Sequence, residues 1–195
     1  MNDAQLLVKL AREAIKTHLE SDQRIDPPLE TSEALKKKSG VFCTLNTYPQ
    51  RQLRGCIGRP YPEFPLIEAL IDSAIDAATR DPRFPRVSLQ ELANLVIEVT
   101  ILTPPTLIEV TSPEDYLQEI QIGRDGLLIE RGHNRGLLLP QVPVEWEWDV
   151  EEFLVHLCNK AFLPANAWKK MDTKIYRFQG EIWGEVAPGG EIKKH

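Results

Sequence analysis

Apolar residues recur at intervals of three and four along three segments of the chain, which is the spacing that places them on one face of an α-helix. The first segment covers residues 1–20, and another begins near Val150. The clearest is PLIEALIDSAIDAATR at 65–80, which starts with a proline suited to a first helical turn and must end before the Asp81–Pro82 pair. We predict long helices in these three segments, and short ones at SEALKKKSG, SLQELAN and SPEDYLQEI.

Other segments are rich in β-branched residues or alternate between apolar and polar positions, which is typical of a strand with one buried face. In LVIEVTIL at 95–102, isoleucine and valine alternate with Glu98 and Thr100. Further strands are expected at 40–46, at 53–58 antiparallel to it, in the hairpin DGLLIERGHNRGLLLPQV, and as one long last strand at 173–186. Helices and strands in this irregular order predict an α+β protein, built mainly on antiparallel sheet flanked by helices.

Proline pairs interrupt the pattern at 27–28 and 104–105, because proline continues neither a helix nor a central strand. Both interruptions are short. We therefore treat 1–195 as a single domain, long enough to bury a substantial core, that divides into a larger and a smaller lobe. The pattern does not define where the lobes meet.

Composition places the chain among ordinary globular proteins, with 42% hydrophobic and 27% charged residues. No apolar run approaches the roughly 20 residues of a membrane helix. The first 20 residues mix charge into their apolar positions, unlike a secretory signal. We therefore expect a cytoplasmic protein without a membrane partner.

Charge and cysteine content exclude further classes of site. The formal net charge of −6 opposes nucleic-acid binding, which usually needs a basic face. The three cysteines are too few and too scattered for a disulfide framework. Because no CxxC pair, HExxH or Cys/His cluster is present, the sequence implies no metal and no cofactor.

The stretch LRGCIG at 53–58 has an unusual composition for a strand, with two glycines around one cysteine. Alternation places Arg54 and Cys56 on one face, about 7 Å apart along the strand. A neighbouring guanidinium increases the thiolate fraction of a thiol. Gly55 and Gly58 would let another backbone or a ligand approach closely. The segment thus fits a small anion site or a reactive thiol, although a free cysteine also packs well as a small buried hydrophobe.

A nucleophilic cysteine needs a base, usually a histidine, within hydrogen-bond reach. Of the four histidines, His195 lies in the polar tail, whereas His133 lies in the glycine-flanked segment RGHNRG. We take His133 as the best candidate partner of Cys56. The alternative is that His133 occupies a simple hairpin turn.

Two further segments offer polar residues for a ligand-binding cleft. DPRFPR at 81–86 contributes Asp81 and Arg83 just after the longest apolar helix, in the kind of loop that often carries function. Its alternative reading is a helix-terminating turn. Gln141, after Pro140, is a candidate polar contact for a ligand, or simply marks the end of a strand.

Several of these motifs together resemble the AMMECR family. GVFCTL, LRGCIG, DPRFP, ELANLVIEVTIL, GLLLPQV and CNKAFLPANAW occur in the order and spacing of that family, over roughly residues 5–186. LRGCIG is the hallmark of the family and is matched in full. The resemblance implies a cytosolic or nuclear α+β protein with a larger and a smaller lobe, and a cleft between them at the hallmark. It also implies an association with Memo-like and radical-SAM proteins, but no particular reaction.

Three functions remain open at this point. The first is a binding or accessory protein whose interlobe cleft, lined by LRGCIG, holds a small molecule or a protein segment. The second is an enzyme with Cys56 as its reactive thiol, Arg54 as anion clamp and His133 as base. The third is an interaction subunit of a system with Memo-like and radical-SAM proteins, acting through an acidic or aromatic surface such as Trp146 and Trp148.

Overall fold

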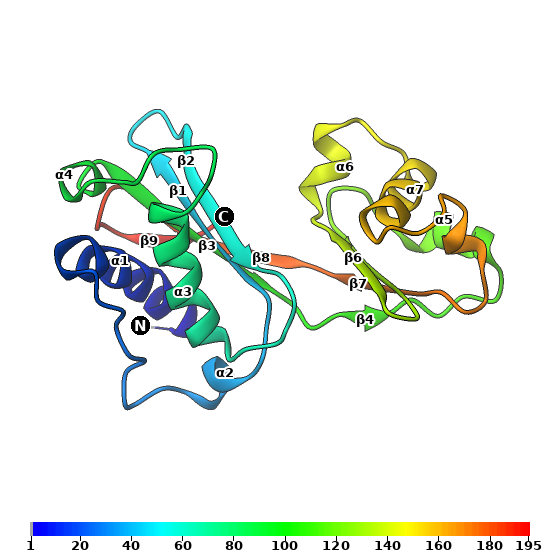
Figure 1. Cartoon of the computed structure of the whole chain (residues 1–195), viewed down its shortest axis with the longest axis horizontal. Helices are drawn as coiled ribbons and strands as arrows, with labels where there is room; N and C mark the ends of the chain where they lie inside the picture. The colour runs from blue at the N-terminus through cyan, green and yellow to red at the C-terminus, as the bar shows by residue number, and fades with distance from the viewer. Residues whose placement is uncertain (1) are drawn as a thin grey trace. The chain divides into compact units, whose positions relative to one another are not determined.

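The computed structural model describes residues 2–195. The chain divides into two compact units (Figure 1). Unit 1 combines the described residues through Leu102 with Glu181–His195, and unit 2 is Thr103–Gly180. The chain first passes from unit 1 to unit 2 between Leu102 and Thr103, directly before the proline pair at 104–105.

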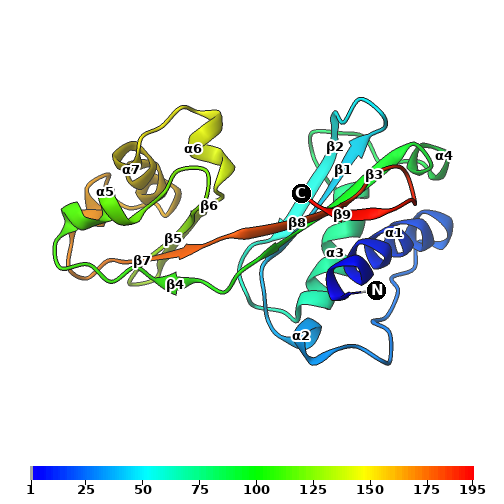
Figure 2. The ribbon, with the colours of Figure 1, turned by 180° about the vertical axis from the view of Figure 1, so that it is seen from behind.

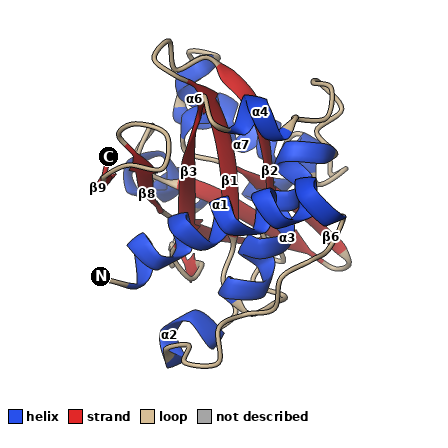
Figure 3. Ribbon diagram, turned by 90° about the vertical axis from the view of Figure 1, so that its left-hand side faces the viewer, coloured by secondary structure: helices blue, strands red, loops and turns tan. Residues whose placement is uncertain are grey.

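Unit 1 is a five-stranded sheet, called sheet 1, with its helices packed on one face. Its strand order is β2-β1-β3-β8-β9. The strands are β1 (Val41–Thr47), β2 (Leu53–Arg59), β3 (Leu95–Leu102), β8 (Gly180–Glu185) and β9 (Ile192–Lys194). The helices are α1 (Asp3–Ser21), α2 (Glu33–Lys36), α3 (Leu66–Thr79) and α4 (Leu89–Leu92). Figure 3 shows α1 and α3 lying across β1, β2 and β3, and Figure 2 shows β9 beside β8.

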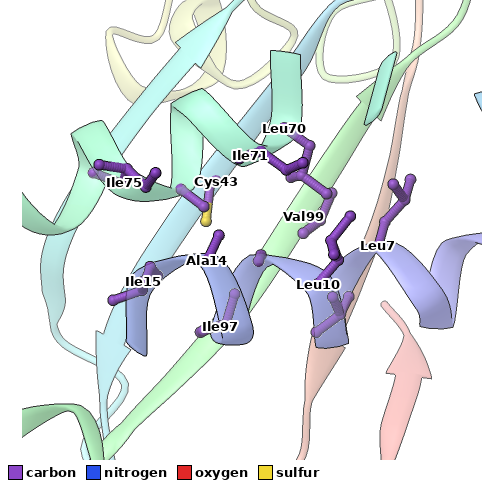
Figure 4. Packing of buried hydrophobic residues seen from close by; sticks show 14 of the residues in the cluster. Leu7, Leu10, Ala14, Ile15, Cys43, Leu70, Ile71, Ile75, Ile97 and Val99 are labelled. Carbon is purple, nitrogen blue, oxygen red and sulfur yellow. The ribbon is translucent and has the colours of Figure 1, made fainter. Parts of the chain in front are cut away.

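The core of unit 1 forms where the apolar stripes of α1 and α3 meet the apolar face of sheet 1 (Figure 4). The sequence pattern predicted both stripes, and the structure confirms them. α1 begins with a capping box in which the Asn2 and Gln5 side chains each accept a backbone N–H of the other residue. The face opposite the helices carries Thr44, Cys56, Glu98 and Thr100, and we call it the polar face of sheet 1.

The strand pairing confirms the predicted hairpin of β1 and β2, and adds β3 on the other side of β1. Both pairs are antiparallel. The register of β1 and β2 shifts between Leu45 and Asn46, so Arg54 has no Cα partner in β1. Such a β-bulge re-aims the side chain of the unpaired residue. The expectation that simple alternation would place Arg54 beside Cys56 is therefore wrong.

A buried ion pair ties α1 to the last strands of unit 1. The Glu185 side chain is 2% exposed and accepts hydrogen bonds from Arg12 Nε at 2.6 Å and from the Ile97 N–H at 3.0 Å. Arg12 also donates to the backbone carbonyls of Leu92 and Leu95. One guanidinium thus links α1, the start of β3 and β8, which are distant in sequence.

Unit 2 is a four-stranded antiparallel sheet with strand order β4-β7-β5-β6. Its strands are β4 (Thr106–Leu107), β5 (Gly126–Arg131), β6 (Asn134–Leu138) and β7 (Lys174–Phe178). Its helices are η1 (Pro113–Asp115), α5 (Tyr116–Glu119), α6 (Gln141–Glu145), α7 (Val150–Lys160) and η2 (Ala167–Lys169). The predicted hairpin is confirmed as β5 and β6, and α7 begins at the predicted Val150.

Unit 2 has a hydrophobic core of its own, in which Phe153 and Leu157 of α7 pack against Leu127 and Ile129 of β5. The predicted single last strand at 173–186 is wrong. The segment forms two strands, β7 and β8, which belong to different sheets. Alternation along the sequence does not reveal this change of sheet, because it does not show which strands each half of the segment pairs with.

Crossing a bilayer requires a helix that is both long enough and apolar enough. Within residues 2–195, no helix has both.

Candidate functional site: the LRGCIG strand

The LRGCIG segment forms β2 at the edge of sheet 1, and two side chains close that edge at Cys56. The Cys56 N–H donates to Asp81 Oδ2 at 2.8 Å, and the Cys56 carbonyl accepts from Arg83 Nη2 at 3.2 Å. Edge strands normally leave such groups open to pairing with another chain. The DPR turn after α3 thus takes the place of a further strand.

Asp81 is the buried centre of this arrangement, with a side chain that is 2% exposed. Its Oδ1 accepts from Arg83 N and Nε at 3.0 and 2.9 Å, and its Oδ2 accepts from Arg83 Nη2 at 2.7 Å. The hydrogen bonds from Arg83 hold the pKa of Asp81 far below its usual range, against the opposing effect of burial. The same contacts raise the pKa of Arg83, and the nearby Cys56 acts in the same direction.

The thiol of Cys56 lies on the polar face of sheet 1 and is half-buried. The Thr44 hydroxyl donates to Cys56 Sγ at 3.3 Å. Thr44 is the Cα partner of both Cys56 in β2 and Glu98 in β3. The three side chains therefore form a row across three strands, in which Cys56 and Glu98 are two strand spacings, about 10 Å, apart.

The Arg54 side chain is paired with an acidic residue of α4. Its guanidinium forms a two-point contact with Glu91 of α4, with Nη2 at 3.1 Å from Oε2, and its side chain is only 13% exposed. The Phe84 ring lies against the guanidinium groups of both Arg54 and Arg83, at 5.8 and 5.5 Å from the ring centroid. Arg83, rather than Arg54, is the guanidinium held next to Cys56.

The two glycines of the motif are used by the protein itself. A Cβ at Gly55 would lie 2.2 Å from the carbonyl oxygen of Ala77, so the absence of a side chain allows α3 to approach the strand. A Cβ at Gly58 would lie 2.3 Å from the Phe42 ring. The close approach that the two glycines predicted is therefore made by α3 at Gly55 and by the Phe42 ring at Gly58.

Sequence reasoning did not select three residues that meet on the polar face, namely Arg51, Glu98 and His195. Arg51 donates to Glu98 Oε1 at 3.2 Å and to the carbonyls of Glu185 and Val186 at 3.0 Å each. A Cβ at Gly184 would lie 2.7 Å from Glu98 Cγ and 2.8 Å from His195 Nε2. His195, which the sequence placed in a polar tail, therefore packs on β8 next to Glu98. The glycine inside β8 was the available signal, because such a glycine often marks a close approach.

The remaining candidates lie in unit 2. His133 is exposed in the two-residue turn between β5 and β6, next to Gly132, whose φ of 60° suits that turn. Gln141 is exposed and begins α6 rather than ending a strand. The structure thus places Cys56 and these two residues in different units, and their shared role stays a prediction.

The tryptophans of VEWEWD form a stack at the surface of unit 2. The Trp146 and Trp148 ring centroids are 6.2 Å apart, and Trp148 stacks on His156 of α7 at 3.8 Å with nearly parallel planes. Trp146 is 68% exposed. Trp148 is half-buried against the core of unit 2, so Trp146 is the exposed member of the stack, and exposed aromatic residues are typical of a surface that contacts a protein partner.

A metal site needs several His, Cys, Asp or Glu side chains close together. No group of three His, Cys, Asp or Glu residues suited to a metal ion occurs within residues 2–195.

Burial distinguishes Cys56 from the other two cysteines. Cys43 and Cys158 are 0% exposed, and desolvation raises the pKa of both thiols. We expect iodoacetamide near neutral pH to modify one thiol of the native protein and all three in denaturant, as counted by mass spectrometry. The Cys56→Ser variant should lose native labelling and keep the other two sites in denaturant. Native labelling of Cys43 or Cys158 would contradict the described packing.

Comparison with known proteins supports the same assignment as the motifs. The AMMECR1 family model matches residues 8–183. A protein of Methanocaldococcus jannaschii is 53% identical over 193 residues, covering 98% of this chain and 94% of the relative. A protein of Pyrococcus horikoshii is 54% identical over 193 residues, covering 97% and 93%. The crystal structure of an uncharacterised protein from Pyrococcus horikoshii matches with a TM-score of 0.81 and 53% identity, covering 98% of this chain and 96% of that one. The chain belongs to the AMMECR1 family.

Proposed function

We propose that the protein is an accessory protein that binds a protein partner on the polar face of sheet 1. The observation that carries this proposal is the row of Cys56, Thr44 and Glu98, presented by three adjacent strands. The strands are held rigid beneath it by α3 packed on Gly55 and by the Asp81–Arg83 closure of the edge. A rigid surface limits the entropy lost on binding.

The contacts of Cys56 favour binding over catalysis. Within the described chain, Thr44 is the hydrogen-bond partner of the sulfur, and no histidine or carboxylate hydrogen-bonds to it. A nucleophilic thiol needs such a base. The arginine expected as an anion clamp, Arg54, is already paired with Glu91. The alternative function is that of an enzyme with Cys56 as its reactive thiol.

The shape of the surface favours a protein segment as the occupant. The row crosses the face of a pleated sheet, and each of its members lies on a different strand. Its thiol, hydroxyl and carboxylate provide both donors and acceptors at regular spacing. Strand addition at Cys56 is blocked, because Asp81 and Arg83 occupy the backbone groups there. Memo-like and radical-SAM proteins, which the family resemblance associates with such chains, are the first partners to test.

The test uses Cys56 as a reporter. The full-length protein is mixed with the purified Memo-like or radical-SAM protein of the same organism, and the rate of Cys56 alkylation is measured with and without it. We expect the partner to slow alkylation at least tenfold. The Thr44→Val and Glu98→Gln variants should weaken the complex in titration calorimetry, each by about tenfold. Glu13→Gln, an exposed substitution on α1, should not.

Two results would overturn the proposal. One is the absence of a complex with either partner. The other is a complex that leaves Cys56 alkylation and both polar-face variants unaffected. An alkylation rate that levels off well below pH 8 would instead support the enzyme alternative, since an unperturbed thiol ionises at about pH 8.5.

A further inference from the structure

Unit 2 contains a pocket of about 270 Å³ that the LRGCIG site does not involve. Its wall runs from Leu107 of β4 along residues 108–113 and is completed by Tyr116, Trp168, residues 170–171 and residues 173–174. All of these residues belong to unit 2. Ligand pockets span about 300–1,000 Å³, so this one suits a small molecule with a single ring system.

The floor of the pocket is aromatic and buried. Tyr116 is 5% exposed, Trp168 is 2% exposed and Ile108 is 3% exposed, and all three belong to the core of unit 2. α5 and η2 hold the two aromatic residues, so the floor is part of the packed structure. A buried aromatic surface of this kind favours a flat apolar ligand.

The polar tips of the two floor residues are open to solvent. Among residues 2–195, none hydrogen-bonds to the Tyr116 hydroxyl or to the Trp168 indole N–H. Burial alone raises the pKa of Tyr116. Neither group is among the buried side-chain atoms without a partner, so each reaches solvent. Both residues line the pocket, so a ligand placed there can accept hydrogen bonds from them in place of water.

The rim of the pocket is cationic, in contrast to the net charge of −6 of the whole chain. Lys170 and Lys174 line it, are exposed and form no ion pair with any described residue. Glu109 is the one carboxylate in the lining. The neighbouring Lys169 is not one of these unpaired lysines, because its Nζ lies 3.1 Å from Glu151 Oε1 and 4.6 Å from the centroid of the Trp168 ring.

We propose that this pocket binds a small aromatic carboxylate, with its ring against Tyr116 and Trp168 and its anionic group toward Lys170 and Lys174. The cationic rim and the solvent-accessible hydroxyl and indole N–H together select an anion that also accepts hydrogen bonds. The apolar floor selects the ring. The proposal is independent of the polar face of sheet 1, because it rests on residues of the other unit.

The experiment uses indoleacetate as the probe, with tryptamine as the same ring carrying a cation and acetate as the same anion without the ring. The protein has four tryptophans, so its proton–nitrogen spectrum shows four indole signals. Trp146→Phe, Trp148→Phe and Trp183→Phe identify the Trp168 signal by elimination and leave the pocket intact. We expect indoleacetate to shift the Trp168 signal with a Kd of about 1 mM or tighter. Tryptamine and acetate should bind at least tenfold more weakly.

Variants separate the contributions of charge and hydrogen bonding. The Lys170→Ala/Lys174→Ala double variant should weaken indoleacetate at least tenfold, and Tyr116→Phe should weaken it several-fold without disturbing the fold. The matched control, Lys37→Ala/Lys38→Ala, removes two exposed lysines of unit 1 and should change nothing. The proposal is overturned if indoleacetate leaves the Trp168 signal unmoved, if tryptamine binds equally well, or if the double variant binds like the unsubstituted protein.

Discussion

Replacing Gly55 by alanine is expected to destabilise unit 1 by about 3 kcal/mol or more. The added Cβ would lie 2.2 Å from the backbone oxygen of Ala77. A backbone carbonyl inside α3 cannot rotate away as a flexible side chain can, so either α3 or β2 must shift. Any such shift disturbs the core where α3 meets sheet 1, because that core is closely packed.

Urea unfolding at neutral pH, with hydrogen exchange read on peptides of α3 and β2, measures this effect. Leu53→Ala is the control, because Leu53 is 43% exposed on the same strand and should cost far less. Gly55→Ala should also increase the alkylation rate of Cys56, since loosening of β2 exposes the thiol. A Gly55→Ala protein as stable as the unsubstituted one would disprove the close approach of α3.

Replacing Asp81 by asparagine is expected to cost about 2–3 kcal/mol of unit 1 stability near neutral pH. The substitution keeps the shape of the side chain but removes the charge that Arg83 pairs with. Removing one partner of a fully buried pair costs about 3–5 kcal/mol. We expect less here because the Arg83 side chain is 53% exposed and stays hydrated when unpaired.

The stability difference between the unsubstituted protein and Asp81→Asn depends on pH, because the pKa of Asp81 is lowered in the folded protein. In the unfolded chain the carboxyl titrates at about pH 3.9. The unfolded state therefore binds the proton first, and the stabilisation is fully present above about pH 4 and is lost as the pH falls toward the folded pKa. The stability gap between the unsubstituted protein and Asp81→Asn should shrink as the pH drops below about 4.

The measurement is a series of urea unfolding curves at decreasing pH for both proteins. Glu30→Gln serves as the charge-matched control, because Glu30 is exposed and lies outside the site. A gap that stays constant through acid pH, or that is absent near neutral pH, would show that the Asp81 carboxylate does not stabilise the edge of sheet 1.

The candidate site was only partly accessible from the sequence. The composition of LRGCIG and DPRFPR indicated that Cys56, Asp81 and Arg83 belong to one feature, and the structure joins them by direct hydrogen bonds. The pairing of Arg54 with Glu91 could not be read from the sequence, because the bulge that leaves Arg54 without a Cα partner has no mark in the local pattern. Arg51, Glu98 and His195 meet only through pairing with β8, which follows more than 70 residues after β3.

The sequence by itself determined the longer helices, most strands, the α+β class and the family, because periodicity, prolines and glycines act on near neighbours along the chain. The tertiary structure alone decided which strands pair, where the last strand changes sheet, and which charges meet. Those outcomes depend on contacts between residues far apart in sequence. The closed edge at Cys56 and the pocket over Tyr116 and Trp168 are both of this kind, since each is assembled from segments that carry no common local signal.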